Sequence, residues 1–281
     1  MKICVLGNGF ISDHLNYIKI NDYIPLDSNY ISNLLDHHKP DVIINCIGKT
    51  GRPNIDWCES NKEITTLTNV ALPTLLAEQC AKRSIHMIHI GSGCIFFGKS
   101  PNINQSILDP KIFCDNGWKE TDFANPKSFY SQTKYGCDLS IGDLDNVTVL
   151  RIRMPISTKN NQRNLINKLR GYQNIINIPN SVTFVDDLVR CIRYVADKKL
   201  TGIFHVTNPE PLTAADVMKE YSRYITTHKF NIISELELDK LTLAKRSNCI
   251  LDSSKLNAKG FFLRPSKEAL EECMAKYIQN L

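Results

Sequence analysis

The sequence predicts a doubly wound α/β fold, in which helices cover both faces of a parallel sheet. Three observations carry this prediction: apolar runs that do not alternate with polar residues, helical patterns between those runs, and a glycine turn, Gly7-Asn8-Gly9, after the first run. Strands without alternation are buried on both faces, and helical connections between them indicate parallel pairing. Right-handed crossovers then give a doubly wound sheet.

The elements follow in order along the first half of the chain. Apolar runs predict strands over residues 2–6, 23–26, 41–45, 85–90 and 147–152. Apolar residues at helical spacing predict helices over residues 11–18, 28–38, 64–83 and 127–141. Pro40 precedes the third strand, and His37-His38 is interpreted as the solvated end of the helix before it.

The pattern changes after Pro155. A polar stretch at residues 160–167 is followed by a predicted strand at 174–179, a helix at 185–198 and a last strand of the main sheet at 202–207. Residues 209–281 are predicted to be mostly helical. We therefore predict a dinucleotide-binding Rossmann domain over residues 1–153, to which 173–207 return, and a smaller, mostly helical C-terminal substrate lobe over 154–172 and 208–281.

The composition excludes several classes of protein. The 281 residues are 42% hydrophobic and 22% charged, with a formal net charge of +5 that no Lys/Arg block concentrates. This is typical of a globular protein, and we expect no nucleic-acid partner. No apolar stretch approaches the ~18 residues that span a bilayer, and the first apolar run is too short for a signal peptide. We expect no membrane partner.

The ten cysteines are scattered singly, without a Cys-x-x-Cys pair. In a chain of this length the pattern favours reduced thiols in a cytoplasmic compartment over disulfides. Neither cysteines nor histidines have the spacing of metal ligands, so no metal site is expected.

The glycine turn is a candidate dinucleotide site. It lies between the first predicted strand and the first predicted helix, where glycines allow backbone N–H groups to approach a pyrophosphate. The alternative is a turn that needs glycine only for a positive φ. Candidate cofactor contacts in this turn are Gly7, Asn8, Gly9, Phe10 and Ile11.

Asp27 has two interpretations. It follows the predicted second strand, where a carboxylate could bind the adenosine ribose, but it could equally be the N-cap of the next helix. The residues of this region do not distinguish NAD from NADP.

Tyr130 and Lys134 are the most informative pair in the chain. Four residues apart, they share one face of a helix. A free tyrosine has a pKa near ~10, and a neighbouring ammonium favours the phenolate and lowers that pKa. The pair therefore fits acid/base catalysis of a carbonyl/alcohol redox step. An ordinary amphipathic helix is the alternative.

Several stretches together resemble one family, the extended short-chain dehydrogenases that act on nucleotide sugars. They are Ser92–Phe96, Tyr130-x-x-x-Lys134, Val182–Asp187 and Arg246–Asp252. Two further stretches, Gly51–Ser60 and Arg151–Ser157, resemble the bifunctional UDP-4-keto-6-deoxyglucose epimerase/reductases of plants and large DNA viruses, which are related to dTDP-4-dehydrorhamnose reductase. The chain departs from the family by Ser12 in place of a third glycine, a turn shorter by a residue and a shorter loop after Ser157.

The resemblance implies NADPH as cofactor and a catalytic set for reduction. In that set Ser92 hydrogen-bonds the substrate carbonyl, Tyr130 donates the proton, and Lys134 lowers its pKa while binding the nicotinamide ribose. Asn69 completes the set, with a solvated or helix-bending amide as the alternative for that residue. The resemblance also places the cofactor against Cys46, Ile47, Gly48, Met154 and Pro155.

A second catalytic set is implied for 3,5-epimerisation. Removing a proton α to a ketone and returning one to the opposite face needs a base and an acid on the two sides of the ring. The family match assigns Cys94 as the base and Lys168 as the acid. Taken alone, Cys94 would be a small buried hydrophobe and Lys168 a surface lysine.

The resemblance implies a nucleotide-sugar substrate, UDP-4-keto-6-deoxyglucose, converted to UDP-L-rhamnose. Substrate contacts are assigned to Arg52, Asn54, Asn164 and Arg246, together with Cys94 and Lys168. For Arg52 the alternative is an ion pair with Glu59. A reductase that works after a separate epimerase and a non-catalytic regulatory subunit are the competing functions. The oligomeric state is left open, with a homodimer as one option.

Overall fold

The computed structural model describes all residues except 22 and 103–116. The chain divides into two compact units. The first unit comprises residues 1–95, 126–151 and 189–204, and the second comprises 96–125, 152–188 and 205–281. The assignment of a dinucleotide-binding domain and a substrate lobe stays a prediction.

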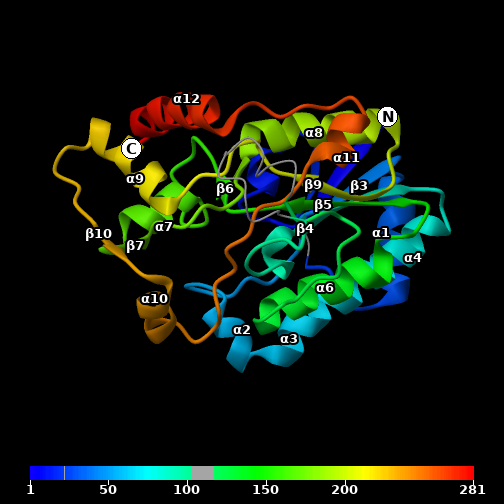
Figure 1. Ribbon diagram of the computed structural model, residues 1–281. Coiled ribbons are helices and arrows are strands. Elements are labelled where there is room, and N and C mark those ends of the chain that lie inside the picture. Colours follow the sequence, from blue (N-terminus) through cyan, green and yellow to red (C-terminus); the bar gives the residue numbers. More distant parts are fainter. Residues whose placement is uncertain (22, 103–116) are drawn as a thin grey trace. The chain divides into compact units, whose positions relative to one another are not determined.

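The first unit is built on a six-stranded sheet with the order β2-β1-β3-β4-β5-β9 (Figure 1). Its strands are β1 (Ile3–Leu6), β2 (Ile18–Ile20), β3 (Val42–Asn45), β4 (His86–Ser92), β5 (Val147–Ile152) and β9 (Gly202–Val206). The first strand in the chain lies inside the sheet, with β2 on one side and β3 on the other. The sheet therefore winds in both directions from β1, and the predicted doubly wound α/β class is confirmed.

The place where the winding reverses is the edge at which such sheets bind ligands. The parallel register pairs Leu6 with Asn45, so β1 and β3 end side by side. The backbone N–H of Cys46 also donates to the Leu6 carbonyl at 2.9 Å. The glycine turn after β1 and the loop after β3 therefore lie next to each other.

Helices cover the sheet on both faces, with α4 and α6 on one face and α8 on the other (Figure 1). The helices of this region are α1 (Ser28–His38), α2 (Asp56–Ser60), α3 (Lys62–Thr66), the π-helical turn η2 (Leu67–Ala71), α4 (Leu72–Ala81), the 3-10 turns η1 (Ser12–His14) and η3 (Gly93–Ile95), α6 (Phe129–Ile141) and α8 (Val185–Lys198).

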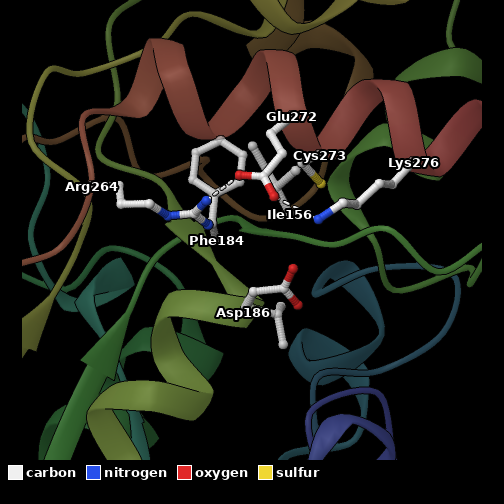
Figure 2. A pocket seen from close by; sticks show the side chains of 8 residues that line it. Ile156, Phe184, Asp186, Arg264, Glu272, Cys273 and Lys276 are labelled. Carbon is white, nitrogen blue, oxygen red and sulfur yellow. Dashed lines mark hydrogen bonds and ion pairs between the residues drawn. The ribbon is translucent and has the colours of Figure 1, made fainter.

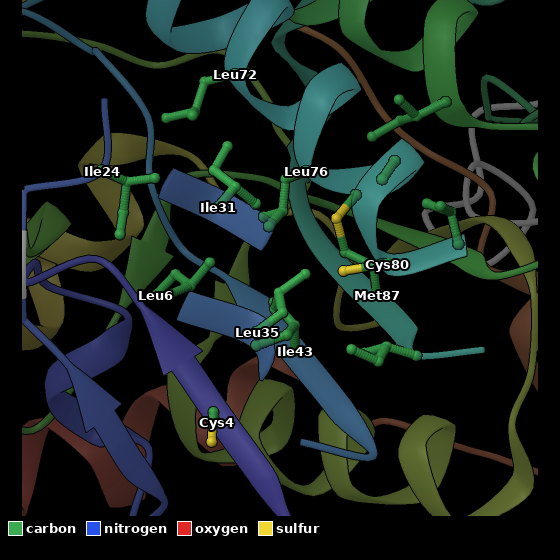
Figure 3. Close-up of a cluster of buried hydrophobic side chains, with 14 of the residues drawn as sticks. Cys4, Leu6, Ile24, Ile31, Leu35, Ile43, Leu72, Leu76, Cys80 and Met87 are labelled. Carbon is green, nitrogen blue, oxygen red and sulfur yellow. The ribbon is translucent and has the colours of Figure 1, made fainter. Parts of the chain in front are cut away.

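The core of the first unit packs β-strand residues against α1, α4 and α6 (Figure 3). Leu6 and Ile43 from the sheet meet Ile31 and Leu35 of α1 and Leu76 of α4, all nearly fully buried. Each such side chain contributes roughly 1.5–3 kcal/mol relative to an exposed one. This core holds the strand ends that carry the site.

Two predicted elements near the N-terminus are wrong. In place of a helix over 11–18 there is only the short turn η1, after which Leu15 is extended at φ −94° and ψ 120° and Ile18 begins β2. Ser12 Oγ accepts from the Gly9 N–H at 2.7 Å and donates to the Gly9 carbonyl at 2.8 Å. A serine that bonds nearby backbone groups competes with helix formation. The second strand is therefore not 23–26 but Ile18–Ile20, which pairs with β1.

Other predicted elements are confirmed within a few residues. Helix α1 matches its predicted bounds, with His37 and His38 in its last turn. The predicted helix over 64–83 is present but interrupted by the π turn η2. Strand β9 closes the main sheet beside β5, as predicted.

The second unit contains two small parallel sheets, which pair β6 (Pro155–Ile156) with β8 (Thr183–Phe184) and β7 (Asn174–Ile176) with β10 (Asn231–Ile233). Its helices are α7 (Leu165–Arg170), α9 (Ala214–Tyr224), α10 (Glu235–Leu241), α11 (Ser254–Ala258) and α12 (Ser266–Gln279). Apolar residues of α7, α9 and α12 form one buried cluster. The predicted helical character after residue 209 is confirmed.

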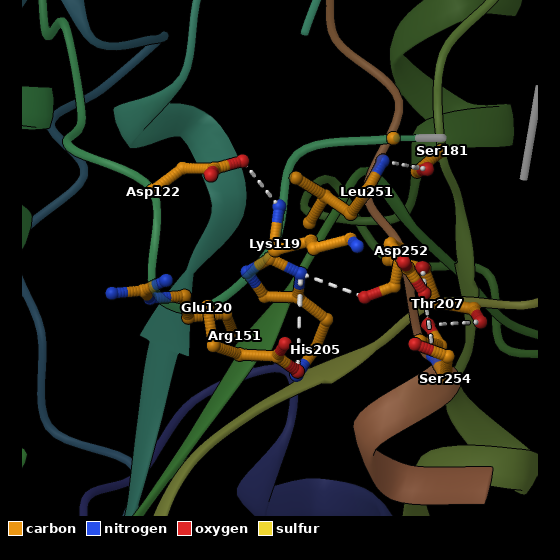
Figure 4. Close-up of polar contacts among 12 residues, drawn as sticks. Lys119, Glu120, Asp122, Arg151, Ser181, His205, Thr207, Leu251, Asp252 and Ser254 are labelled. Carbon is orange, nitrogen blue, oxygen red and sulfur yellow. Dashed lines mark hydrogen bonds and ion pairs between the residues drawn. The ribbon is translucent and has the colours of Figure 1, made fainter. Parts of the chain in front are cut away.

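Polar contacts brace the second unit around His205 (Figure 4). Its Nδ1–H donates to the Asp252 carbonyl at 3.0 Å, and its backbone N–H donates to Glu120 Oε1 at 2.8 Å. Asp187, in the first turn of α8, is buried and accepts from Arg264 Nε at 2.9 Å. This contact gives the Asp187 carboxylate a structural role. No helix of the described residues is long and apolar enough to cross a membrane.

Candidate active site

The glycine turn uses its two glycines differently. Gly7 has φ +98°, and a Cβ there would lie 3.1 Å from the backbone of Cys46 and Ile47. A Cβ on Gly9 would meet no atom within 4 Å. Gly7 is therefore required by the fold of the turn itself, whereas Gly9 leaves open space beside exposed backbone. That space is where a bound pyrophosphate would need to approach.

The predicted helix N-terminus behind this turn is absent, because η1 has only three residues. Phe10 is buried and Asn8 is exposed. A phosphate at this turn would depend on backbone N–H groups of the loop itself rather than on a helix dipole.

The loop after β3 is shaped by Asn45. Its Oδ1 accepts from the Ile47 N–H at 3.0 Å, which turns the chain immediately after the strand. Cys46 is half-buried, and burial raises the pKa of its thiol to about 12. It is therefore a neutral residue of the loop wall, and Gly48 is exposed beside it.

Asp27 acts as the N-cap of α1. Its Oδ1 accepts from the Tyr30 N–H at 2.8 Å. The structure thus shows the capping interpretation directly, while the adenosine contact stays a prediction.

Tyr130 and Lys134 lie on one face of α6, as predicted. The helix begins because Ser128 caps it, accepting from the Ser131 N–H at 3.2 Å, and because Glu59 Oε1 accepts from the Phe129 N–H at 2.8 Å. Both site residues are buried, Tyr130 at 9% and Lys134 at 4% exposure. A helix terminus fixed by two side chains holds the pair in a defined position.

The ammonium of Lys134 lies beside strand β4. Its Nζ donates to the Ile90 carbonyl at 3.1 Å and lies 3.1 Å from His89 Nε2. Burial, with a further contribution from the Lys134 charge, holds the pKa of His89 well below its ordinary value. His89 is therefore neutral beside the lysine.

One helical turn further, Asp138 forms a buried ion pair with Arg151, at 2.8 Å between Oδ2 and Nε. Burial raises the pKa of Asp138, and the Arg151 and Lys134 charges oppose that rise. Charged and polar groups thus continue along the buried face of α6 beyond Tyr130 and Lys134.

Ser92 and Cys94 follow each other at the end of β4. Ser92 is buried, and its Oγ accepts from the Cys94 N–H at 3.2 Å. Ser92 therefore has a role in the turn, but this bond uses an oxygen lone pair and leaves the hydroxyl proton to donate. Cys94 is half-buried in η3, against which α6 packs.

Asn69 sits in the π turn η2 and is 1% exposed, so the solvated interpretation of its amide is wrong. Its Nδ2 donates to Thr133 Oγ1 at 3.0 Å, and Thr133 donates to the Tyr130 carbonyl at 2.8 Å. The amide thereby ties η2 to the first turn of α6. π turns inside helices are frequent at functional sites.

The segment around Arg52 and Asn54 forms a tight loop. A Cβ on Gly51, at φ +68°, would lie 2.5 Å from the Asn54 carbonyl oxygen. Asn54 Oδ1 accepts from the Asp56 N–H at 2.8 Å and starts α2. Arg52 is exposed, and the Glu59 carboxylate bonds α6 instead of forming the alternative ion pair.

The second unit carries the remaining predicted site residues. Met154 has φ +38° directly before Pro155 and β6, a strained conformation of the kind found at functional sites. Lys168 and Arg246 are both half-buried, Lys168 within α7. Their assigned roles stay predictions.

Asn164 has a structural role that the sequence did not indicate. It is fully buried, caps α7 by accepting from the Ile166 N–H at 3.3 Å, and donates to the carbonyls of Ser157 and Lys159 at 2.6 and 2.8 Å. Its amide is thus occupied within the loop, which disfavours the predicted substrate contact.

A pocket in the second unit lies among Phe184, Asp186, Arg264, Glu272 and Lys276 (Figure 2). Glu272 pairs with both Arg264 and Lys276 across it. None of the predicted site residues lines this pocket, and its charges neutralise one another.

Four residues with buried polar contacts had no individual role predicted from the sequence: Asn45, His89, Thr133 and Arg153. Arg153 is buried and donates through Nη2 to the Ser247 carbonyl at 3.0 Å, beside Arg246. Asn45 and His89 could have been noticed in the sequence, because each is a polar residue within a strand predicted to be buried on both faces.

The sheet order, the glycine turn at the reversal point and the buried Tyr130/Lys134 pair define a Rossmann-like protein with the residues of a dehydrogenase. The chain belongs to the family described as the RmlD substrate binding domain, which matches residues 18–279.

Relatives of known description agree with this family. The chain is 37% identical over 235 residues to the bifunctional dTDP-4-dehydrorhamnose 3,5-epimerase/dTDP-4-dehydrorhamnose reductase of Arabidopsis thaliana, covering 83% of this chain and 75% of that protein. It is 38% identical over 242 residues to a trifunctional UDP-glucose 4,6-dehydratase/3,5-epimerase/reductase of the same plant. That match covers 85% of this chain and 34% of the relative, so the chain spans about a third of the trifunctional protein's length.

Solved structures give the same fold. The crystal structure of the L780 UDP-rhamnose synthase from Acanthamoeba polyphaga mimivirus has a TM-score of 0.88 and 29% identity, covering 98% of this chain and 99% of that one. A dTDP-4-dehydrorhamnose reductase from Clostridium acetobutylicum has a TM-score of 0.80 at 21% identity and the same coverage, a likeness of fold.

Proposed function

We propose that this protein reduces the 4-keto group of a nucleotide-linked 6-deoxyhexose with NADPH, and that it converts UDP-4-keto-6-deoxyglucose to UDP-L-rhamnose by 3,5-epimerisation followed by this reduction. The observation that carries the proposal is the buried Tyr130/Lys134 pair on one face of α6, in which Lys134 bonds the Ile90 carbonyl of β4, two residues before Ser92. The names of the trifunctional Arabidopsis relative and of the mimivirus UDP-rhamnose synthase support the UDP-linked substrate. The names of both Arabidopsis relatives support the two reactions, the bifunctional one on a dTDP-linked sugar.

The first unit fits a dinucleotide. Its glycine turn lies at the reversal point of the sheet, and the space beside Gly9 is free of protein atoms. The loop from Cys46 to Gly48 flanks it, and Tyr130 and Lys134 follow on α6. We assign the pyrophosphate to the turn and the nicotinamide ribose to Tyr130 and Lys134, with NADPH supplying the hydride when bound.

The reduction needs a proton at the C4 oxygen as the hydride arrives. The Tyr130 hydroxyl donates it, and the neighbouring Lys134 ammonium stabilises the phenolate that forms. The hydroxyl proton of Ser92 is left to hydrogen-bond the same oxygen, since its lone pair accepts from Cys94.

The epimerisation is assigned to Cys94 and Lys168. It requires removing a proton α to the ketone and returning one to the other face, which one group does not easily do. Cys94 follows Ser92 in η3, which places it next to the proposed carbonyl contact in the chain. Arg52, Asn54 and Arg246 are proposed to bind the nucleotide sugar, with arginine suited to the pyrophosphate.

One experiment tests the proposal. The protein is incubated with UDP-4-keto-6-deoxyglucose and NADPH, and the product is identified by NMR. UDP-L-rhamnose formed with stoichiometric NADPH oxidation is expected. If the protein reduces only a 4-keto sugar that has already been epimerised at C3 and C5, it is a reductase that depends on a separate epimerase. If it reacts with no nucleotide-linked sugar, a regulatory subunit becomes the better interpretation.

A further inference from the structure

A chain of hydrogen bonds fixes which nitrogen of His89 carries the proton. Asn45 and His89 face each other on neighbouring strands, since the register of β3 and β4 pairs them. Asn45 Oδ1 accepts from the Ile47 N–H at 3.0 Å, so the amide nitrogen Nδ2 points to His89 Nδ1, at 3.1 Å. An amide nitrogen donates only, and His89 Nδ1 must therefore accept.

The proton of the neutral ring then resides on Nε2. Burial keeps His89 neutral by lowering its pKa far below the ordinary value. Its Nε2 has two neighbours, the Lys134 Nζ at 3.1 Å and the Cys137 Sγ at 3.6 Å. A lysine ammonium has no lone pair to accept a hydrogen bond, whereas a thiol sulfur accepts weakly. Burial raises the pKa of Cys137 to about 12, so its sulfur is a neutral acceptor for the Nε2–H.

This polarity determines what holds the lysine. The Nε2–H of His89 and the ammonium of Lys134 are both donors. His89, on strand β4, therefore offers Lys134 no acceptor. Among the residues that the structure describes, the acceptor for Lys134 is the Ile90 carbonyl at 3.1 Å. The other N–H groups of the ammonium are left for a ligand.

We propose that His89, fixed as its Nε2–H tautomer by Asn45, is a positioning residue that keeps the Lys134 ammonium available to the ribose of the cofactor. This inference rests on the proposed function, because it takes the ribose as the ligand of Lys134. The opposite tautomer would offer Nε2 as an acceptor, bind the ammonium to the strand and compete with the cofactor.

The tautomer can be read without any cofactor. The protein is labelled with ¹⁵N in its histidines. Two-bond ¹H–¹⁵N correlations then distinguish the two neutral tautomers and the cation of each ring. The signals of His89 are identified among those of the seven histidines by their loss in His89→Gln. The Nε2–H tautomer is expected in the wild-type protein. An Nδ1–H tautomer, or a ring protonated on both nitrogens at neutral pH, would overturn the inference.

The functional consequence is tested with Asn45→Asp. A carboxylate still accepts from the Ile47 N–H, but its second oxygen accepts from His89 Nδ1–H and reverses the chain. The Lys134 ammonium then gains a hydrogen bond to His89 Nε2, which cofactor binding must break. Because breaking a hydrogen bond of a charged group costs at least about 1.4 kcal/mol, the affinity should be about tenfold weaker. We expect the Kd of NADPH measured by calorimetry, and its KM, to rise by about that factor, with kcat at saturating NADPH little changed.

Two further variants complete the test. Cys137→Ser keeps an acceptor for the Nε2–H, so its NADPH affinity should stay within about twofold of wild type. Asn45→Leu keeps the branching of the side chain, with a larger volume, and removes the amide that fixes the ring, so it should weaken NADPH binding as Asn45→Asp does.

The outcomes separate this inference from the proposed function. If both Asn45 variants bind NADPH as tightly as the wild-type protein, the inference about His89 is wrong and the proposed function still stands. Absence of NADPH binding by the wild-type protein would overturn the proposed function, while the tautomer would still be measured independently.

Discussion

Asn69 bonds both backbone groups of Lys49: its Oδ1 accepts from the Lys49 N–H at 2.7 Å, and its Nδ2 donates to the Lys49 carbonyl at 3.0 Å. A single side chain in the π turn thereby fixes the loop that follows β3. Because Nδ2 also donates to Thr133 on α6, the amide joins three segments of the candidate active site. Asn69 therefore positions the loop after β3 against helix α6.

Replacing Asn69 should destabilise the protein. In Asn69→Ala the part-buried N–H of Lys49 loses its acceptor, Thr133 Oγ1 loses a donor, and the Lys49 carbonyl keeps only the Cys58 thiol at 4.0 Å. A buried polar group that is left unsatisfied costs about 1–3 kcal/mol. We expect the free energy of unfolding, measured by urea denaturation, to fall by at least about 2 kcal/mol. The control is Thr66→Ala, one turn earlier on an exposed face, which should change it by less than about 0.5 kcal/mol. Equal effects of the two variants would contradict this account.

The two glycines of the turn should respond in opposite ways. Gly9→Val adds a side chain to open space, so the protein should keep its stability but bind NADPH more weakly by at least about tenfold. Gly7→Ala places a Cβ at φ +98° against the Cys46 backbone and should lower the free energy of unfolding by about 1–3 kcal/mol. Calorimetric titration and urea denaturation measure the two effects. Unchanged NADPH affinity in Gly9→Val would place the cofactor elsewhere.

The fold could be predicted from the sequence where the hydrophobic pattern is local. Strand β5, helix α1 and helix α8 have their predicted bounds because their apolar period is set by their own residues. Strand β2 could not be predicted, since its three residues become a strand through pairing with β1.

The candidate site was predictable only in part, for the same reason. The Tyr130/Lys134 spacing is local to one helix and could be read directly. The contact of Asn45 with His89 depends on the register of two strands, and the burial of Asn164 depends on how its loop closes on Ser157 and Lys159. Such contacts exist only in the folded chain.

Tyr130→Phe should separate catalysis from binding. The substitution removes the hydroxyl that donates the proton and leaves the ring in its buried place, so reduction should fall by about 10²-fold or more. NADPH affinity measured by calorimetry should stay within a few fold of wild type. Near-normal NADPH oxidation by this variant would refute the assignment of the proton donor.

Acid should destabilise the protein through its buried histidines. Burial lowers the pKa of His89 well below its ordinary value and lowers that of His86 as well. Below a pH of about 6.5 the unfolded state binds protons at these rings and the folded state does not, so stability is constant above that pH and is lost as pH falls below it. Each ring contributes up to about 1.4 kcal/mol per pH unit.

His89→Gln tests the contribution of that ring. Urea denaturation above and below pH 6.5 should show a smaller acid-induced loss in the variant, by about 1 kcal/mol per pH unit. Ile88→Val, a buried neighbour that does not titrate, should lose about 1 kcal/mol equally at both pH values. An acid-induced loss in His89→Gln equal to that of wild type would show that the ring is protonated in the folded state.

The last prediction separates a bifunctional enzyme from a simple reductase. Cys94→Ala and Lys168→Ala should each abolish solvent-deuterium exchange at C3 and C5 of UDP-4-keto-6-deoxyglucose, because each removes one of the two groups that proton exchange on opposite faces requires. Both variants keep Tyr130 and Lys134, so a ketone that has already been epimerised should still be reduced at a substantial rate. Arg170→Ala, two residues after Lys168 on α7 and also half-buried, is the control and should retain exchange. If the wild-type protein reduces the pre-epimerised ketone without any deuterium incorporation, Cys94 and Lys168 have no part in proton transfer and a separate enzyme must supply the epimerised substrate.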